Sequence, residues 1–292
     1  MKSANSARGK RGALVLIGGS EDKQGDMAIL NRVLEEGGSR HITVVPSASG
    51  EPEKMAVRYT RAFSDLGAAH VEVLDIRAPD EADAARCLRA AEETDAIFFT
   101  GGDQVRLVRI LEGSAFMEIV RERHARGMAV AGTSAGAAAA SDTMIYEGDG
   151  EGYLKETVHH APGFGFLSDI AVDTHFVVRG RIARLIQVLA GGLASRGIGL
   201  AEDTAAVFDG DGRFEVVGSG VVVVLNGGAI GYSNYGEIDA YDTISVEGVR
   251  MGMLSPGTVF DLETWQIRRP ASVTADAEGR SLLNRAVERF LE

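Results

Sequence analysis

The sequence predicts an α/β fold, a doubly wound and mostly parallel sheet with helices on both faces. In the first half of the chain, short apolar runs alternate five times with segments of helical spacing. The runs have no polar interruption, which is typical of strands covered on both faces. Strict alternation of strand and helix predicts parallel strands joined by crossover helices. Turns rich in Gly and Ser end the runs and suit short strand-to-helix connections.

Five strand–helix units are expected before residue 141. The predicted strands span residues 13–17, 42–45, 71–76, 96–99 and 128–131. The predicted helices span residues 26–34, 51–66, 81–92 and 105–126, the last broken near Gly113, and an alanine-rich helix follows residue 136. Right-handed crossovers bring the carboxyl ends of such strands to one edge of the sheet, where ligands bind.

The second half of the chain differs in composition and in its pattern of apolar residues. Residues 141–166 are Gly-rich and acidic, and they predict an ordered loop near the site. We expect a strand over 170–176, a helix over 179–190, a strand over 198–201, a β-rich C-terminal part over 205–244 with a hairpin turn at 209–212, and a closing helix over 281–291. One domain is expected over residues 1–292, with residues 1–11 disordered.

Composition limits the classes of function. The chain has 292 residues and a net charge of −12, which argues against nucleic acid or an anionic membrane surface as a partner and is compatible with a cationic substrate. No apolar run reaches membrane-spanning length, and residues 13–17 are too few for a signal-peptide core, so a cytoplasmic protein is expected. The single cysteine, Cys87, excludes an internal disulfide framework and a thiolate zinc site.

Residues 132–136 read G-T-S-A-G between an apolar run and an alanine-rich segment. Strand, tight turn with a central serine, then helix is the layout of a nucleophile elbow. Ser134 is expected to have a strained backbone, and Gly132 and Gly136 allow neighbouring backbone to approach closely. The N–H of Ala135 then points to where an oxyanion would form. These residues predict a serine nucleophile.

A serine nucleophile needs a base, and the base needs a group that orients it. His175 ends a predicted strand and is therefore expected at the same edge as Ser134. The next strand ends at Glu202 and Asp203, and either carboxylate could accept the imidazole N–H. The chain order serine, histidine, acid differs from that of the α/β-hydrolases, which argues against that fold. Two further histidines open predicted strands and are expected at the opposite edge: His41 and His70.

Six stretches in chain order resemble the serine-peptidase family that contains the cyanophycinases and the aspartyl dipeptidases. They are I-G-G-S-E-D-K (17–23), V-P-S-A-S (45–49), F-T-G-G-D-Q (99–104), G-T-S-A-G-A (132–137), D-T-H-F (173–176) with R-G-R and Arg184 (179–184), and G-L-A-E-D-T-A (199–205). Together they extend over roughly residues 13–206, and the combination is far more specific than any single motif.

The resemblance implies a triad of Ser134 as nucleophile, His175 as base and Glu202 as orienting acid. It also implies a sheet like that of the class I glutamine amidotransferases. The reaction would be acyl transfer that needs no metal and no cofactor. The family favours a homodimer, and we carry that expectation over to this chain.

The resemblance further implies the groups that bind the substrate. The oxyanion donors would be the backbone N–H of Gly102, or of its neighbour Asp103, and that of Ala135. Thr174 stands where the family commonly has glutamine, and the shorter side chain puts one substrate contact in doubt. The substrate pocket maps to Gln104, Asp173, Thr174, Arg179, Arg181 and Arg184.

The function implied is cleavage of cyanophycin, multi-L-arginyl-poly-L-aspartate, into β-Asp-Arg dipeptides by a serine exopeptidase. Arginine side chains suit the carboxylates of this polymer because they bind them in a bidentate manner. Asp173 would supply the opposite charge for an amine or guanidinium. Two alternatives stay open, an aspartyl or isoaspartyl dipeptidase of the same family and a non-catalytic binding protein on this fold.

Overall fold

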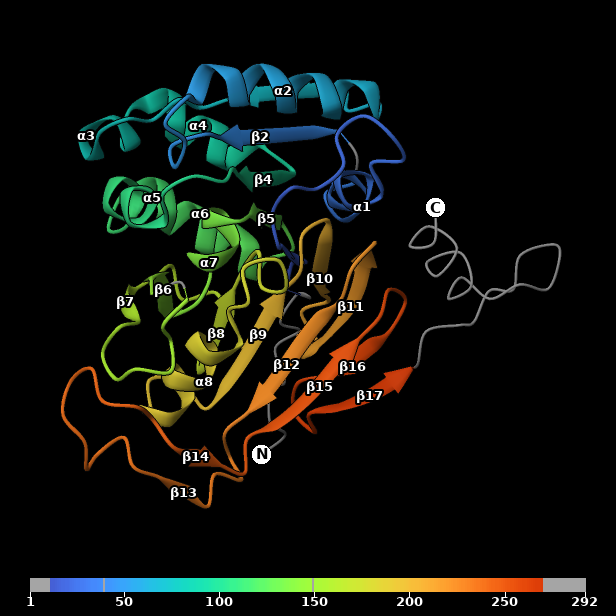
Figure 1. Cartoon of the computed structure of the whole chain (residues 1–292). Coiled ribbons are helices and arrows are strands. Elements are labelled where there is room, and N and C mark those ends of the chain that lie inside the picture. The colour runs from blue at the N-terminus through green and yellow to red at the C-terminus, as the bar shows by residue number, and fades with distance from the viewer. Residues whose placement is uncertain (1–10, 39, 149, 270–292) are drawn as a thin grey trace, which may run out of the picture.

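The first half of the chain forms the parallel part of a nine-stranded sheet (Figure 1). The computed structural model describes residues 11–38, 40–148 and 150–269. The parallel strands are β1 (Leu14–Ile17), β2 (His41–Val45), β3 (His70–Val73), β4 (Ala96–Phe99) and β5 (Ala129–Thr133). They lie in the order β1-β5-β4-β2-β3, so the predicted alternation of strands and helices around a parallel arrangement is confirmed.

The helices of this half cover both faces of the sheet. They are α1 (Ala28–Glu36), α2 (Pro52–Asp65), α3 (Pro79–Ala82), α4 (Ala85–Glu93), α5 (Gln104–Leu111), α6 (Ala115–Ala125) and α7 (Ala135–Ala138). On one face, Phe63 of α2 packs in a cluster with Val44 of the sheet. On the other, Phe116 of α6 belongs to the cluster that contains Phe99. Helices on both faces are therefore confirmed.

The helix predicted over 81–92 is in fact two helices, α3 and α4. Ala84 between them has an extended backbone, with φ −61° and ψ 140°. The carboxylate of Asp83 accepts a hydrogen bond at 2.8 Å from the N–H of Ala115, which is the first residue of α6. Asp83 thus satisfies a first-turn N–H of α6, whose N-cap is Ser114, while the chain leaves the helical conformation at Ala84. The break predicted near Gly113 is confirmed, since α5 ends at Leu111 and α6 begins at Ala115.

The alanine run after the elbow forms a shorter helix than its composition suggests. α7 ends at Ala138, although alanines continue to Ala140. The carbonyl of Ala139 accepts the N–H of Phe164 at 2.6 Å, and that of Ala140 accepts the N–H of Leu167 at 3.1 Å. Tertiary hydrogen bonds therefore replace the intrahelical ones that helix propensity would favour.

The expectation of a mostly parallel sheet is wrong. Four antiparallel strand pairs continue the nine-stranded sheet beyond β1, equal in number to the four parallel pairs. The added strands are β10 (Thr204–Phe208), β11 (Arg213–Gly218), β16 (Val259–Asp261) and β17 (Gln266–Arg269). Asp209 closes the predicted turn by accepting the N–H groups of Asp211 and Arg213. A tight hairpin forces antiparallel pairing, which apolar runs alone do not reveal.

A second sheet of four strands carries part of the site, which the sequence did not predict. Its order is β15-β12-β9-β8, and only β8 and β9 are parallel. Its elements are β8 (Ile170–Asp173), α8 (Ile182–Ala190), β9 (Arg196–Leu200), β12 (Val222–Asn226) and β15 (Arg250–Leu254). The strands before His175 and Glu202 therefore lie outside the sheet of the elbow, contrary to expectation.

Two ribbons complete the described fold. β6 (Thr143–Glu147) pairs with β7 (His159–Pro162), so residues 141–166 form a β-ribbon in part and not one continuous loop. β13 (Tyr232–Ser233) pairs with β14 (Val246–Glu247). The β-rich part continues to β17, well past the predicted end at residue 244. The expectations for residues 1–10 and for a helix over 281–291 lie outside the described residues.

One hydrophobic cluster joins the two sheets. Leu16 and Phe99 of the large sheet share it with Val172 and Leu200 of the smaller one. Cys87 is buried in the same cluster, and burial raises the pKa of its thiol, which agrees with a packing role. Within residues 11–38, 40–148 and 150–269, no helix combines the length and apolar character needed to span a membrane.

Candidate active site

Ser134 stands at the end of β5, a central strand between β1 and β4. Its backbone has φ 51° and ψ −106°, a conformation that is strained for a residue with a side chain. Its N–H donates to the carbonyl of Ile17 at 2.9 Å, which ties the turn to β1. Strand, strained serine and short helix form the predicted elbow.

The two glycines of the elbow are required by close packing. A Cβ at Gly132 would lie 2.4 Å from the backbone of Gly136, and a Cβ at Gly136 would lie 2.5 Å from the carbonyl oxygen of Phe99. Both distances are far below van der Waals contact. The predicted reason for these glycines, close approach of backbone around the serine, is confirmed.

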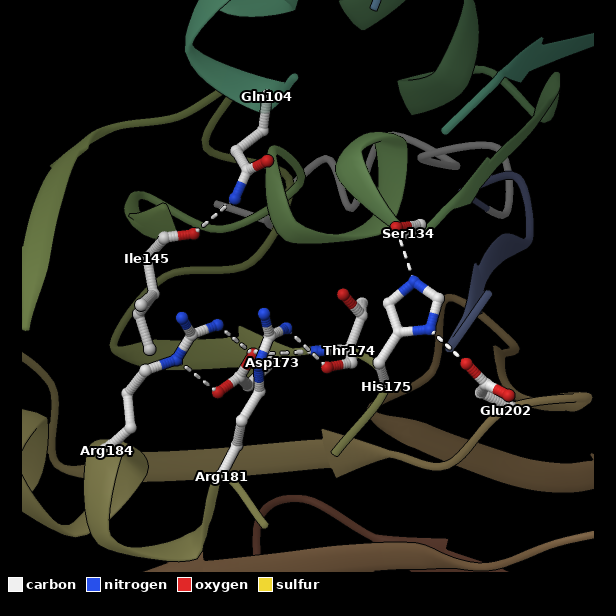
Figure 2. Close-up of polar contacts among 9 residues, drawn as sticks. All are labelled: Gln104, Ser134, Ile145, Asp173, Thr174, His175, Arg181, Arg184 and Glu202. Carbon is white, nitrogen blue, oxygen red and sulfur yellow. Dashed lines mark hydrogen bonds and ion pairs between the residues drawn. The ribbon is translucent and has the colours of Figure 1, made fainter. Parts of the chain in front are cut away.

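His175 faces the serine from the smaller sheet (Figure 2). Its Nε2 lies 2.9 Å from Ser134 Oγ, and its Nδ1 lies 2.6 Å from Oε1 of Glu202. Because Nδ1 donates to the carboxylate, Nε2 is left as the acceptor for the serine hydroxyl. His175 also has a positive φ of 50°, so two neighbouring residues of the site hold strained backbone.

Glu202, and not Asp203, contacts the histidine. Its hydrogen bond to His175 is the largest of several effects that hold the pKa of Glu202 below its ordinary value, and these effects together outweigh burial, which acts to raise it. Asp203 has a different task, since its carboxylate accepts the N–H of Asp22 at 2.9 Å and the hydroxyl of Ser219 at 2.6 Å. The sequence left these two acids open by position alone, and the contacts separate them.

The end of β1 joins the three segments of the site. Three successive carbonyls at residues 17–19 each accept a backbone N–H at 2.8–2.9 Å. The donors are Ser134, His175 and Asp203. The G-G-S-E-D-K motif thus begins at the point where the elbow, which follows the large sheet, meets the two loops that follow the smaller sheet.

A buried carboxylate lies behind the elbow. Glu21 is 3% exposed and accepts hydrogen bonds from Thr133 Oγ1 at 2.6 Å and Tyr59 Oη at 2.5 Å. Lys23 Nζ lies 3.0 Å from its Oε1. Burial acts to raise the pKa of Glu21, but the charge of Lys23 and the two hydroxyl groups outweigh it and lower that pKa. The sequence placed this motif near the site without identifying Glu21.

The predicted oxyanion donors lie around the serine. A Cβ on Gly101 would be 3.3 Å from Ser134 Cβ, which brings the loop after β4 against the elbow. The N–H of Asp103 donates to the carbonyl of Ala48 at 2.9 Å, and its carboxylate caps α5. Asp103 therefore has a structural role, which favours Gly102 of the two alternatives. Ala135 follows Ser134 as the first residue of α7.

A cavity of about 390 Å³ opens beside the serine. It is lined by Gly102, Gln104, Ser134, Tyr146, Glu147, Gly148, Thr174, His175, Arg179 and Arg181. Tyr146 and Glu147 come from the end of β6 and are residues that sequence reasoning missed. The only signal was the acidic character of residues 141–166, because their position depends on the pairing of β6 with β7.

Asp173 and Arg184 lie behind this cavity and not on its surface. Arg184 contacts the carboxylate of Asp173 through Nε and Nη2, at 2.9 and 2.5 Å, and Arg181 Nη1 lies 3.3 Å from the same carboxylate (Figure 2). The three side chains are 1–7% exposed. Asp173 therefore balances the arginines of the chain itself, whereas the sequence assigned it to the substrate.

The other four predicted pocket residues all line the cavity: Gln104, Thr174, Arg179 and Arg181. Arg179 is exposed and lines the cavity, as does the buried Arg181. Thr174 is buried, and its carbonyl accepts from Arg181 Nη1 at 2.7 Å. Gln104 donates its side-chain amide to the carbonyl of Ile145 at 2.9 Å, which holds β6 at the cavity wall. The structure thus brings all but Asp173 and Arg184 to the cavity.

A strained serine with a histidine acceptor and a carboxylate behind it is the arrangement of a serine hydrolase. Comparison with known families agrees with this class. The family described as Peptidase family S51 matches residues 14–216. The chain belongs to peptidase family S51 and is a serine-type peptidase.

Curated relatives match most of the chain. It is 38% identical over 254 residues to a cyanophycinase of Trichormus variabilis, covering 86% of this chain and 85% of the relative. A cyanophycinase of Geminocystis herdmanii is 38% identical over 260 residues, covering 88% and 96%. One from Thermosynechococcus vestitus is 34% identical over 271 residues, covering 91% and 84%. The family resemblance inferred from the six stretches is confirmed.

A solved structure supports the fold. The crystal structure of a peptidase from an acI-B1 Actinobacterium superposes with a TM-score of 0.66 at 20% sequence identity, covering 87% of this chain and 98% of that one. At this identity the likeness concerns the fold alone. It confirms a mixed α/β fold.

Proposed function

We propose that this peptidase is a cyanophycinase, a serine exopeptidase that hydrolyses cyanophycin to β-Asp-Arg dipeptides. The observation that carries the proposal is the pair of hydrogen-bond contacts that link Ser134 Oγ to His175 and His175 to Glu202. Ser134 and His175 also line a cavity to which Arg179 and Arg181 contribute. Similarity to cyanophycinases over 86–91% of the chain supports the choice of substrate.

In the proposed mechanism, His175 Nε2 takes the proton of Ser134 as Oγ attacks a backbone carbonyl of the polymer. The N–H groups of Gly102 and Ala135 hold the oxyanion, and Glu202 stabilises the imidazolium that forms. The imidazolium then gives its proton to the amine of the leaving group as the peptide bond breaks. Water, deprotonated by His175, attacks the acyl-enzyme and restores the serine hydroxyl. No step requires a metal or cofactor.

The charges at the cavity fit the two ends of each arginyl unit of the polymer. An arginine attached through its α-amine keeps a carboxylate and a guanidinium. Arg179 and Arg181 would bind carboxylates, because guanidinium groups pair with them in a bidentate manner. Glu147 would bind the guanidinium, since it is the one acidic residue among those that line the cavity within the described part of the chain. Glu147 thus takes the role that the sequence gave to Asp173.

We also propose a domain organisation and a fold relationship for the protein as a whole. We propose one peptidase domain, which the hydrophobic cluster shared by both sheets supports. A relationship to the class I glutamine amidotransferase fold is supported by an elbow on a central parallel strand. A homodimer in the cytoplasm, without nucleic acid or membrane as partner, stays a prediction. Light scattering coupled to size-exclusion chromatography measures the oligomeric state directly.

The test is release of β-Asp-Arg from insoluble cyanophycin by the purified protein. Ser134→Ala is expected to lower the rate about 10⁴-fold or more, because the nucleophile is lost. Ser64→Ala, at an exposed position of α2, is the matched control and should leave the rate unchanged. Full activity of Ser134→Ala would contradict the assignment of the nucleophile. Cleavage of short isoaspartyl peptides without cleavage of the polymer would identify a dipeptidase instead.

A further inference from the structure

The opposite edge of the large sheet carries a group of metal-ligating side chains, His41, His70 and Glu72. His41 opens β2 and His70 opens β3, and the two residues are partners in the parallel register. Thr43 is the partner of Glu72 in that register. Because side chains alternate between the faces of a strand, His41, His70 and Glu72 all project from the same face. This edge is the one predicted for both histidines from the sequence.

The three side chains converge. Their ligand atoms lie within 4.8 Å of one another, and no second group of this kind occurs among the residues that the structure describes. His41 Nε2 is 3.8 Å from Glu72 Oε2, and the two imidazole rings are 4.6 Å apart between centroids. Ligand atoms of a tetrahedral zinc ion are about 3.3 Å apart, given bonds of about 2.0–2.1 Å. Small side-chain rotations, easiest at the exposed His70, would close the remaining gap.

A second observation concerns the ring nitrogen of His41. Nε2 is buried and has no hydrogen-bond partner within the described parts of the chain. Leaving such an atom unsatisfied is unfavourable, so buried ring nitrogens normally have a partner. The atom that lacks a partner is also the one that faces Glu72. A bound cation would satisfy the imidazole and the carboxylate together.

We propose that His41, His70 and Glu72 form a binding site for a divalent transition-metal ion, with Zn²⁺ as the best match. Two imidazole nitrogens and one carboxylate oxygen are a common zinc donor set, and water would supply the fourth position. The site lies at the amino ends of β2 and β3, whereas Ser134 lies at the carboxyl end of its strand. The proposal is therefore independent of the proposed peptidase function.

Arg86 of α4 is the group that competes with the metal. Its Nε lies 3.5 Å from Glu72 Oε1, and its Nη2 donates to the carbonyl of Val73. A guanidinium beside the carboxylate weakens cation binding by charge repulsion and by occupying one oxygen. Removal of Arg86 should consequently strengthen zinc binding, whereas removal of a ligand should weaken it.

The test is a calorimetric titration of the untagged, chelator-treated full-length protein with zinc sulfate. Wild-type protein is expected to bind one zinc ion per chain at this site. His70→Gln, at an exposed position, should weaken binding about tenfold or more, and Glu72→Gln should do the same. His160→Gln, which removes an exposed histidine outside the cluster, is the matched control and should bind as wild type does.

Arg86→Gln supplies a prediction of opposite sign. Its zinc affinity should rise, which a merely structural histidine pair would not produce. The proposal is overturned if wild-type protein shows no saturable binding, if His70→Gln binds as tightly as wild type, or if Arg86→Gln binds more weakly. Peptidase activity is expected to be unchanged in His70→Gln and Arg86→Gln, so failure of the zinc site and failure of the proposed function are distinguishable.

Discussion

Arg184 forms a buried two-point ion pair with Asp173 behind the cavity (Figure 2). Arg181 contacts the same carboxylate, so one anion faces two cations in a space that is almost closed to water. The pairing has two consequences. It makes Asp173 a structural residue, and it positions Arg181, which reaches the cavity surface. Arg181, which we propose to bind the substrate, is thus held in place by a carboxylate that does not line the cavity.

Asp173→Asn is expected to lower the free energy of unfolding by about 3–5 kcal/mol, because removal of one partner leaves buried charges unbalanced. Denaturant unfolding measures the change. Glu122→Gln is the matched control, since it breaks an exposed ion pair with Arg126 and should cost less than about 1 kcal/mol. If Asp173→Asn and Glu122→Gln had equal free energies of unfolding, the buried ion pair would not stabilise the fold more than the exposed one does.

Glu202→Gln is expected to lower kcat about 10³- to 10⁴-fold, because an amide neither stabilises the imidazolium nor fixes the tautomer of His175. Since the pKa of Glu202 is lowered, its carboxylate stays ionised at pH values below those at which an ordinary glutamate becomes protonated, and the contribution is lost as the pH falls through that lowered pKa. Asp203→Asn, whose carboxylate contacts Asp22 and Ser219, should lower kcat less than about tenfold. Comparable losses in the two variants would contradict the choice of Glu202.

Glu147→Gln is expected to reduce kcat/KM for β-Asp-Arg units about 10- to 100-fold, mainly through KM, because a charge-assisted hydrogen bond is worth about 1.5–3 kcal/mol. Steady-state kinetics with arginyl and neutral β-aspartyl peptides measures the effect, and neutral peptides should lose nothing. Glu151→Gln, exposed in the same segment, is the control. An equal loss of kcat/KM for both kinds of peptide would show that Glu147 does not recognise the arginyl guanidinium.

Glu21 and Thr133 are expected to act as one unit that positions Ser134. Glu21→Gln and Thr133→Val should each slow acylation, and the double variant should lose less than the sum, with a coupling of about 0.5–3 kcal/mol. The acylation rate with a fluorophosphonate probe reports the position of the serine independently of substrate binding. Additive losses in this cycle would mean that the buried carboxylate acts on stability alone.

His124 is expected to make the stability of the protein depend on pH. Burial, partly offset by the N–H that Nδ1 donates to the carbonyl of Met128, lowers the pKa of His124 from 6.5 to about 4. Between these values the unfolded chain binds a proton that the folded chain does not. Stability therefore falls as the pH drops from about 6.5, and the loss is complete below about 4 and amounts to about 3 kcal/mol.

The measurement is the free energy of unfolding of wild type and His124→Asn between pH 4 and pH 7, because the asparagine keeps a donor near Met128 and cannot titrate. The difference between the two free energies of unfolding should change with pH at the slope expected when the unfolded state binds one proton more than the folded state. Parallel curves would show that His124 is not the group responsible.

Much of the site was predictable because its central feature is local. The elbow needs only one strand, two glycines and a serine within a few residues, and these are contiguous at 129–136. His175 and Glu202 could be placed because each follows an apolar run. Their strands nevertheless belong to a second sheet, since apolar runs do not reveal which strands pair. The contact to Ser134 arises through residues 17–19, whose carbonyls join the two sheets.

The sequence by itself determined the α/β class, the serine elbow and the family, because these depend on short-range patterns and contiguous motifs. Tertiary structure alone decided the roles of the charged groups. Asp173 is paired with arginines instead of substrate, Glu147 reaches the cavity through the pairing of β6 with β7, and His41 faces Glu72 across two strands. The physical reason is that a charge acts according to its neighbours and its access to water, and both are set by long-range packing.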